Sequence, residues 1–247
     1  MKLNSSDFLG IIPARFNSTR LKGKPLMKIG EKTMIEHVYS RASEVLDNLV
    51  VATDDKNIFD TVNNFGGNVV LTEKDHLNGT SRCLEAVDIW SKELEKSFNY
   101  IINIQGDEPL LHEDHIIKVI ECFNDSKTEF ATIAQKLNFS DNLPKDKVFL
   151  VKDSFNFALY FSRHPIPYQR TLETHVNYFK HVGIYAFRKQ ALLDFATMPI
   201  TPLEASEKIE CIRFLEYGKR IKMVETFSKI IGIDTPEDLE KAKQIVK

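Results

Sequence analysis

The sequence predicts an α/β protein with a mixed, mainly parallel sheet and helices on both faces. Short apolar runs alternate with segments whose apolar residues recur at helical spacing, and glycine, proline or polar residues separate them. With 247 residues, 43% of them hydrophobic, the chain can build one large core. We therefore expect a single domain, residues 1–247, with two halves of about 1–125 and 126–247.

The first half alternates strand and helix most regularly. The apolar run Phe8 to Ile12 is typical of a buried strand, and Pro13 is expected to end it. Further strands are expected at residues 49–52, 69–71 and 100–104. Helices are expected after the capping box of Thr33 and Glu36 and at residues 58–65, 83–90 and 116–123.

The second half is less regular. We expect strands at residues 130–136, 157–162, 181–187 and 221–225, and loops at residues 138–150 and 164–179. Thr201-Pro202-Leu203-Glu204 combines a cap, a proline at the first helical position and a capping acid. This start predicts one helix that runs to about Tyr217 and stops at Gly218. Thr235-Pro236 is expected to open the last helix.

The composition excludes several classes of protein. The formal net charge of −2 excludes a general nucleic-acid binder. The sequence contains no apolar run long enough to span a membrane, so we expect no membrane segment. Gly10 and Pro13 interrupt the apolar run near the N-terminus, so we expect no signal peptide. We therefore expect the protein in the cytoplasm. The cysteines have no zinc or disulfide spacing and are expected to be buried free thiols: Cys83, Cys122 and Cys211.

A basic loop follows the first strand. No acid occurs between Asp7 and Glu31, and Gly23 would let the backbone approach a ligand closely. A cation-rich loop at the carboxyl end of a buried strand is where α/β proteins bind phosphate. The pattern is neither a P-loop nor a dinucleotide fingerprint, and charge alone is equally consistent with a solvated loop. The cations of this loop are Arg15, Arg20, Lys22 and Lys24.

Two aspartates occupy comparable turns. Asp107 follows a predicted strand in a Gly-Asp-Glu-Pro turn, and Asp234 precedes the last helix in a Gly-Ile-Asp turn. Taken singly, each is most simply a turn residue or a cap. Together with a polycationic loop they suggest Mg²⁺, which accompanies phosphates and is held by one or two protein carboxylates. Thr235 is the better cap for the last helix, which leaves the Asp234 side chain for another role.

The order and spacing of motifs resemble one family over almost the whole chain. The basic loop reads Gly10-Ile-Ile-Pro-Ala-Arg-Phe-Asn-Ser-Thr-Arg-Leu-Lys-Gly-Lys-Pro-Leu26. Further matching segments are residues 51–54, 79–82, 103–109, 158–163, 181–185, 202–204, 209–213 and 232–239. Together they resemble the 3-deoxy-manno-octulosonate cytidylyltransferases, or CMP-Kdo synthetases.

The resemblance implies a Rossmann-like nucleotide-diphospho-sugar transferase fold. It implies an enzyme that transfers CMP from CTP to the sugar acid Kdo for lipopolysaccharide synthesis. It also implies a homodimer, a first half that binds nucleotide and a second half that binds the sugar acid and forms the dimer. Triphosphate contacts would come from Arg15 and Lys24, and Mg²⁺ would be held by Asp107 and Asp234.

The resemblance also implies two substrate pockets. Arg82 and the backbone of Pro13 and Ala14 match the cytosine pocket, and Arg20 of the basic loop is counted with the substrate-binding residues. A guanidinium such as that of Arg163 can bind a sugar-acid carboxylate bidentately. Two of the sugar-acid residues lie in a predicted strand and could equally be core residues. The sugar-acid residues are Gln105, Arg163, His181, Tyr185 and Glu210.

Two departures leave the choice of acid open. Ser81 stands where the family usually has an acid, and Phe149 where it usually has a lysine. The alternatives are a cytidylyltransferase for a related acid, such as 8-amino Kdo or a nine-carbon sialic-type acid, and a non-catalytic sugar-nucleotide binding module. A binding module would have little reason to retain both Asp107 and Asp234.

Overall fold

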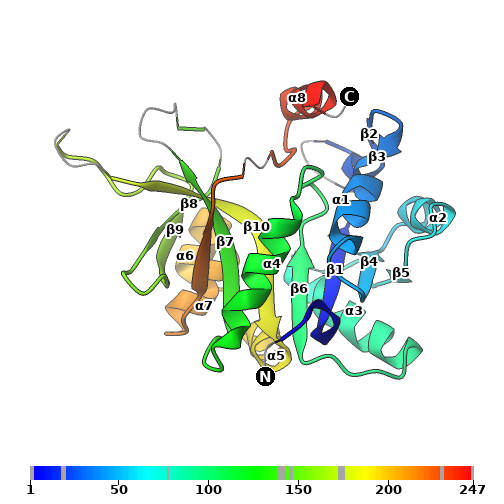
Figure 1. Ribbon diagram of the computed structural model, residues 1–247, viewed down its shortest axis with the longest axis horizontal. Coiled ribbons are helices and arrows are strands. Elements are labelled where there is room, and N and C mark those ends of the chain that lie inside the picture. The colour runs from blue at the N-terminus through cyan, green and yellow to red at the C-terminus, as the bar shows by residue number, and fades with distance from the viewer. Residues whose placement is uncertain are drawn as a thin grey trace.

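A nine-stranded mixed sheet forms the centre of the described molecule (Figure 1). The computed structural model describes residues 3–17, 21–76, 78–137, 143–144, 147–171, 176–228 and 231–245. The sheet order is β11-β7-β10-β6-β1-β4-β5, and β8 pairs with both β10 and β9. Its strands are β1 (Phe8–Ala14), β4 (Leu49–Thr53), β5 (Val69–Leu71), β6 (Tyr100–Ile104), β7 (Phe130–Leu137), β8 (Phe149–Lys152), β9 (Ala158–Ser162), β10 (Tyr178–Arg188) and β11 (Lys222–Thr226).

Helices cover both faces of this sheet, as the sequence predicts. They are α1 (Met34–Ser43), α2 (Lys56–Asn64), α3 (Gly79–Glu93), α4 (Glu113–Glu121), α5 (Lys189–Thr197), α6 (Pro202–Glu207), α7 (Cys211–Glu216) and α8 (Pro236–Ile245). Short 3-10 helices span Ser5–Asp7, Lys24–Leu26 and Cys122–Asn124, and β2 (Lys28–Ile29) pairs with β3 (Lys32–Thr33) in a separate hairpin.

Alternate residues of β1 enter two different cores, because successive side chains of a strand point to opposite faces. Leu9 and Ile11 pack with residues of α3, α5 and α7. Phe8 and Ile12 pack with residues of α1, α2 and α4. This alternation fixes which face each helix covers. The three cysteines are buried in these cores as free thiols, as expected.

Parallel pairing brings several strand ends to one edge. β1 runs parallel to β4 and β6, and β4 runs parallel to β5, whereas β10 is antiparallel to β6 and β7. The residues that follow β1, β4, β5 and β6 therefore meet at the same edge, where open α/β sheets bind ligands. They include Arg15, Asp54, Thr72 and Gln105.

Pro13 does not end the first strand, contrary to the prediction. β1 continues to Ala14, and Pro13 lies opposite Ala52 of β4. The pairing of β1 with β6 ends at Ile11. At Pro13 the strand has a partner on one side alone, so its missing N–H interrupts no pairing with β6.

The single helix predicted from residue 202 to 217 is also wrong. α6 ends at Glu207 and α7 begins at Cys211. Between them Lys208 adopts a left-handed conformation, with φ 53° and ψ 46°. No glycine or proline marks this break, which is why the pattern of residues did not reveal it. β8 is likewise a strand where a loop was expected at residues 149–150.

A buried ion pair joins the two halves of the broken helix. Arg213 of α7 donates from Nε and Nη2 to the two carboxylate oxygens of Glu204 on α6, at 2.6 and 2.5 Å. Its Nη1 donates to the carbonyl of Met198 at 3.0 Å. Both side chains are almost inaccessible. The bidentate geometry therefore compensates the burial of both charges.

We expect Arg213→Met to lower the free energy of unfolding by about 3–5 kcal/mol, because it leaves the Glu204 carboxylate buried without its partner. Urea unfolding measures the change. The double variant Glu204→Met/Arg213→Met should recover much of the loss, since it removes both charges. An unchanged unfolding midpoint in Arg213→Met would show that the pair does not join α6 to α7.

Candidate active site

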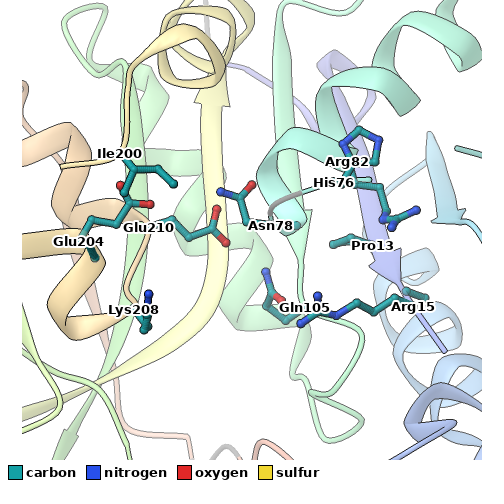
Figure 2. Close-up of a pocket in the computed structure, with 13 residues that line it drawn as sticks. Pro13, Arg15, His76, Asn78, Arg82, Gln105, Ile200, Glu204, Lys208 and Glu210 are labelled. Atoms are coloured by element: carbon teal, nitrogen blue, oxygen red, sulfur yellow. The ribbon is translucent and has the colours of Figure 1, made fainter. Parts of the chain in front are cut away.

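A cavity of about 510 Å³ opens at the edge where β1 and β6 end. One wall comes from β1 and the start of α3, the other from α6 and the segment that leads to α7, with Gln105 between them (Figure 2). The cavity is lined by Pro13, Ala14, Arg15, His76, Asn78, Gly79, Arg82, Gln105, Ile200, Glu204, Ala205, Lys208 and Glu210.

The first turn of α3 lies very close to β1. Asn78 caps the helix by accepting a hydrogen bond from the Ser81 backbone at 2.9 Å. A Cβ atom at Gly79 would stand 3.3 Å from Cγ of Pro13 and 3.5 Å from Nε2 of Gln105. Glycine therefore allows the helix terminus to reach the end of β1.

Arg82 is nearly buried and held from several directions. Its Nη1 donates to Oγ1 of Thr72 at 2.5 Å and to the carbonyl of Glu73 at 3.2 Å. Its Nη2 lies 3.3 Å from a carboxylate oxygen of Asp54. Asp54 and Thr72 follow neighbouring parallel strands, so the sheet edge itself fixes this guanidinium on the cavity wall.

The opposite wall carries a buried carboxyl group, that of Glu210. Figure 2 shows its side chain extending into the space between the two walls. Burial raises the pKa of Glu210, and a hydrogen bond from the Thr80 side chain partly offsets this. Within the described part of the chain, Oε2 of Glu210 has no hydrogen-bond partner. A buried oxygen of this kind suits a ligand hydroxyl.

A second cluster of charges surrounds the ammonium group of Lys24. Nζ lies 2.7 Å from Asp107 Oδ2, 3.4 Å from Asp234 Oδ1 and 2.5 Å from the carbonyl of Ile233. Lys147 lies 3.6 Å from the other Asp234 oxygen. Two segments far apart in the sequence thus share one cation, which a third segment supplies.

The cap of α8 matches the expectation. Oγ1 of Thr235 accepts from the Asp238 backbone at 3.2 Å, and Asp238 Oδ2 accepts from the backbone of Asp234 and Thr235. The helix terminus is satisfied without the Asp234 side chain, which instead lies beside Lys24.

The structure brings many of the predicted residues together. One group lines the cavity: Pro13, Ala14, Arg15, Arg82, Gln105 and Glu210. A second group forms the ion cluster: Lys24, Asp107 and Asp234. Arg20 lies outside the described residues.

Three predicted residues do not line this cavity. Arg163 donates from Nε to the Glu207 carbonyl at 2.7 Å and from Nη2 to the Lys208 carbonyl at 3.2 Å. His181 lies 3.0 Å from the hydroxyl of Thr132, and its ring is 5.3 Å from that of the buried Tyr185. Burial lowers the pKa of His181 to about 3 and raises that of Tyr185. Substrate contacts by these three stay predictions.

Sequence reasoning gave no site role to four polar residues of the cavity, Asn78, Glu204, His76 and Lys208, of which the last two carry the least signal. Nε2 of His76 lies 2.5 Å from Glu85, and its Nδ1 lies 3.3 Å from the Ser81 hydroxyl. Lys208 stands on the opposite wall. Neither belongs to a spacing pattern with a chemical meaning. The charge of Lys208 in an apparently helical segment is typical of a solvated face.

Comparison with known proteins identifies the family. A model described as cytidylyltransferase matches residues 9–221. The chain belongs to the cytidylyltransferase family. It is 43% identical over 244 residues to the 3-deoxy-manno-octulosonate cytidylyltransferase of Christiangramia forsetii, with 96% of each chain covered. It is 45% identical over 243 residues to that of Fusobacterium nucleatum, with 97% covered in each.

Solved structures agree. The structure of CMP:2-keto-3-deoxy-manno-octonic acid synthetase complexed with CTP has a TM-score of 0.88 and 35% identity, with 97% of this chain and 98% of that chain covered. The 4-diphosphocytidyl-2C-methyl-D-erythritol synthase of Anaerococcus prevotii, 14% identical with a TM-score of 0.62, shares the fold alone. The predicted nucleotidyltransferase fold and enzyme class are confirmed. No helix among the described residues could span a membrane.

The lowered pKa of His181 predicts a pH-dependent stability. An unfolded histidine binds a proton below its ordinary pKa of 6.5, whereas the folded one stays neutral down to about 3. The unfolded state therefore holds more protons, and stability falls as the pH falls below about 6.5, by about 1.4 kcal/mol per pH unit.

Urea unfolding at pH 7 and pH 5 measures this loss, which should be about 2 kcal/mol smaller in His181→Gln than in the wild type. The exposed His164 provides the control variant His164→Gln. An identical pH dependence in His181→Gln and the wild type would contradict the neutral state of His181.

Proposed function

We propose that this chain transfers CMP from CTP to Kdo, giving CMP-Kdo and pyrophosphate for lipopolysaccharide biosynthesis. The observation that carries the proposal is the cavity itself. Motif residues from five separate segments of the sequence, ending with Glu210, line one space at the sheet edge. The near-full-length identity to relatives named for this reaction supports the same substrates.

The nucleotide lies on the wall formed by β1 and α3. Cytosine has acceptor atoms to which a fixed guanidinium can donate, and an amino group that can donate to backbone carbonyls. Arg82 and the backbone of Pro13 and Ala14 therefore recognise the base. Arg15, at the end of β1, faces the phosphates as a cation. The rigid attachment of Arg82 to Asp54 makes the pocket selective, because it cannot adapt to another base.

The sugar acid lies between Gln105 and Glu210. A Cβ atom at Gly183 would stand 2.6 Å from Cγ of Gln105, so the glycine leaves room for that side chain beside β10. The Gln105 amide and the unpartnered Glu210 oxygen bind hydroxyl groups of the sugar. His181, Tyr185 and Arg163 belong to the same side of the proposal, although none of the three lines the cavity.

Mg²⁺ completes the proposal. Among the described residues, no three His, Cys, Asp or Glu side chains gather as a metal site. The carboxylates of Asp107 and Asp234 nevertheless converge on one cation, the Lys24 ammonium, together with the Ile233 carbonyl. An all-oxygen donor set of this kind fits Mg²⁺, which completes its shell with water and phosphate. When bound, Mg²⁺ neutralises charge on the phosphates.

The reaction requires mainly positioning. The anomeric hydroxyl attacks the α-phosphorus and pyrophosphate leaves. Arg82 on one wall and Glu210 on the facing wall, with Gln105 between them, hold the two reactants in one cavity, which supplies proximity. Arg15 offsets developing phosphate charge. Lys24 lies at the same edge and adds a second cation once its carboxylate partners are shared with the metal.

A homodimer is part of the proposal, as is a location in the cytoplasm. The arm formed by β8, β9 and the segment after β9 leaves large apolar side chains in water: Phe155 is 71% exposed, Leu159 60% and Tyr168 88%. Apolar surface of this extent is typical of protein interfaces. We propose that a second copy of the chain covers it, and sedimentation analysis tests this.

Pyrophosphate release tests the function. With CTP, Mg²⁺ and Kdo, the purified chain should release pyrophosphate, and UTP should support a rate at least roughly 100-fold lower, because a pocket that hydrogen-bonds a base edge rejects a base with different groups. Parallel reactions with 8-amino Kdo and a nine-carbon sialic-type acid decide among the acids. Equal rates with UTP and CTP would contradict the cytosine pocket, and no release with any acid would favour a binding module.

We expect Asp107→Asn and Asp234→Asn to retain the fold and lose most turnover, because each keeps the shape of the side chain but removes a charge. The double variant should be scarcely slower than either single one, since both changes disable the same geometry. Activity against Mg²⁺ concentration and Mn²⁺ binding measured by electron paramagnetic resonance provide independent readouts. The control variant is Asp60→Asn, because Asp60 forms an exposed ion pair with Lys56.

The variant Lys24→Met tests the same metal site through its Mn²⁺ affinity. It should lose turnover, yet bind Mn²⁺ more tightly without nucleotide, because the competing ammonium is gone. Full turnover in EDTA, or an aspartate variant with wild-type Mn²⁺ affinity, would remove these carboxylates from a metal site.

A further inference from the structure

Lys208 stands on the cavity wall that faces Arg15 and Arg82 (Figure 2). We infer that its ammonium group binds the carboxylate of the sugar acid and that Arg163 positions it for this contact. The inference rests on the proposed function and assigns the acid-recognising cation to a residue outside the matched motifs. Four observations support it: the position of Lys208, its free charge, its backbone conformation and its attachment to Arg163.

The charge of Lys208 is available to a ligand. Arg82 is engaged by Asp54, Thr72 and a carbonyl, and Lys24 by the ion cluster. Within the described ranges, the Lys208 side chain forms no ion pair or hydrogen bond, since the bonds of this residue are made by its backbone.

The acids near Lys208 already have other partners. Arg213 neutralises Glu204, and the Glu207 carboxylate accepts from the Ser162 hydroxyl at 2.8 Å and the Arg163 backbone at 2.9 Å. Thr80 donates to Glu210 on the same wall. Lys208 therefore supplies an unshared positive charge on the side of the cavity away from Arg15, where a second anionic group can bind.

The backbone of Lys208 argues for a function of its side chain. Its φ of 53° lies in the left-handed region, which glycine adopts without strain and lysine does not. α6 ends there with a hydrogen bond from the Lys208 N–H to the Glu204 carbonyl at 2.7 Å. Glycine would end the helix equally well. Strained conformations of this kind persist where the side chain is needed.

Arg163 fixes the segment that carries Lys208. The Nε–Nη2 edge of its guanidinium donates to the carbonyls of Glu207 and Lys208, so the residue after β9 holds the end of α6. These bonds occupy the edge with which an arginine commonly binds a carboxylate bidentately. Arg163 therefore acts on the sugar acid through Lys208. This indirect role explains why Arg163 matters to the acid although it does not line the cavity.

The variant Lys208→Gly separates function from structure. It relieves the backbone strain, so its melting temperature should equal or exceed that of the wild type. Its KM for Kdo should nevertheless rise roughly 10- to 100-fold, because a charged hydrogen bond is lost. The KM for CTP should stay within about twofold of the wild-type value. Lys208→Arg should retain part of the affinity for Kdo.

The chain offers a matched control at Glu95, a second non-glycine residue with a positive φ, of 51°, beyond the end of α3. Glu95→Gly relieves the same strain and should leave both KM values unchanged. An unchanged KM for Kdo in Lys208→Gly would overturn the inference, as would equal increases in the KM values for Kdo and CTP.

A double-mutant cycle tests the role of Arg163. If Arg163 acts through Lys208, the KM of Arg163→Ala/Lys208→Gly for Kdo should not exceed that of Lys208→Gly alone. Multiplicative increases would show that Arg163 contacts the acid itself and would overturn its positioning role.

The wild-type reaction distinguishes this inference from the proposed function. Release of pyrophosphate with another sugar acid but not with Kdo would refute the proposed substrate, while the same KM comparison with that acid would still judge Lys208. Turnover with Kdo and an unchanged KM in Lys208→Gly would refute the role of Lys208 alone. A wild type that turns over no acid would overturn both.

Discussion

The ammonium group of Lys24 holds together three segments that the sequence separates widely. Asp107 belongs to the turn after β6, Asp234 precedes α8, and Lys24 ends the basic loop. Two carboxylates facing one another without a cation would repel, so this contact permits the sheet edge and the start of α8 to meet. A small apolar cluster of Leu21, Ile29, Met34, Ile233 and Ala242 supports the same junction.

The sequence predicted best what hydrophobic patterning controls. The buried run of β6 appears at residues 100–104 as expected, because a strand covered on both faces is mostly apolar, here with Asn103 as its one buried amide. The motif residues of β1, α3 and β6 reached one cavity because parallel strands place their ends at one edge. The predicted strand end at Pro13 was wrong, because the strand is paired on only one side there and can continue without the N–H that proline lacks.

What the sequence could not reveal depends on backbone conformation and on single polar residues. The break at Lys208 carries no glycine, so only the structure shows that a cavity wall replaces a continuous helix. His76 lines the cavity through contacts with Glu85 and Ser81 that no spacing rule anticipates. Arg163 had the right chemistry for a carboxylate, but its guanidinium is bound to backbone carbonyls.

The position of Asp234 in the sequence has a consequence for protein synthesis. The ribosome makes β1, α3, β6 and both cavity walls before it makes the segment that begins α8. A growing polypeptide can thus assemble its sheet and cavity while Lys24 is paired with Asp107 but not yet with Asp234. Attachment of α8 to the β2–β3 hairpin brings the second carboxylate to the sheet edge, so the charge cluster can be completed only after both cavity walls have been synthesised.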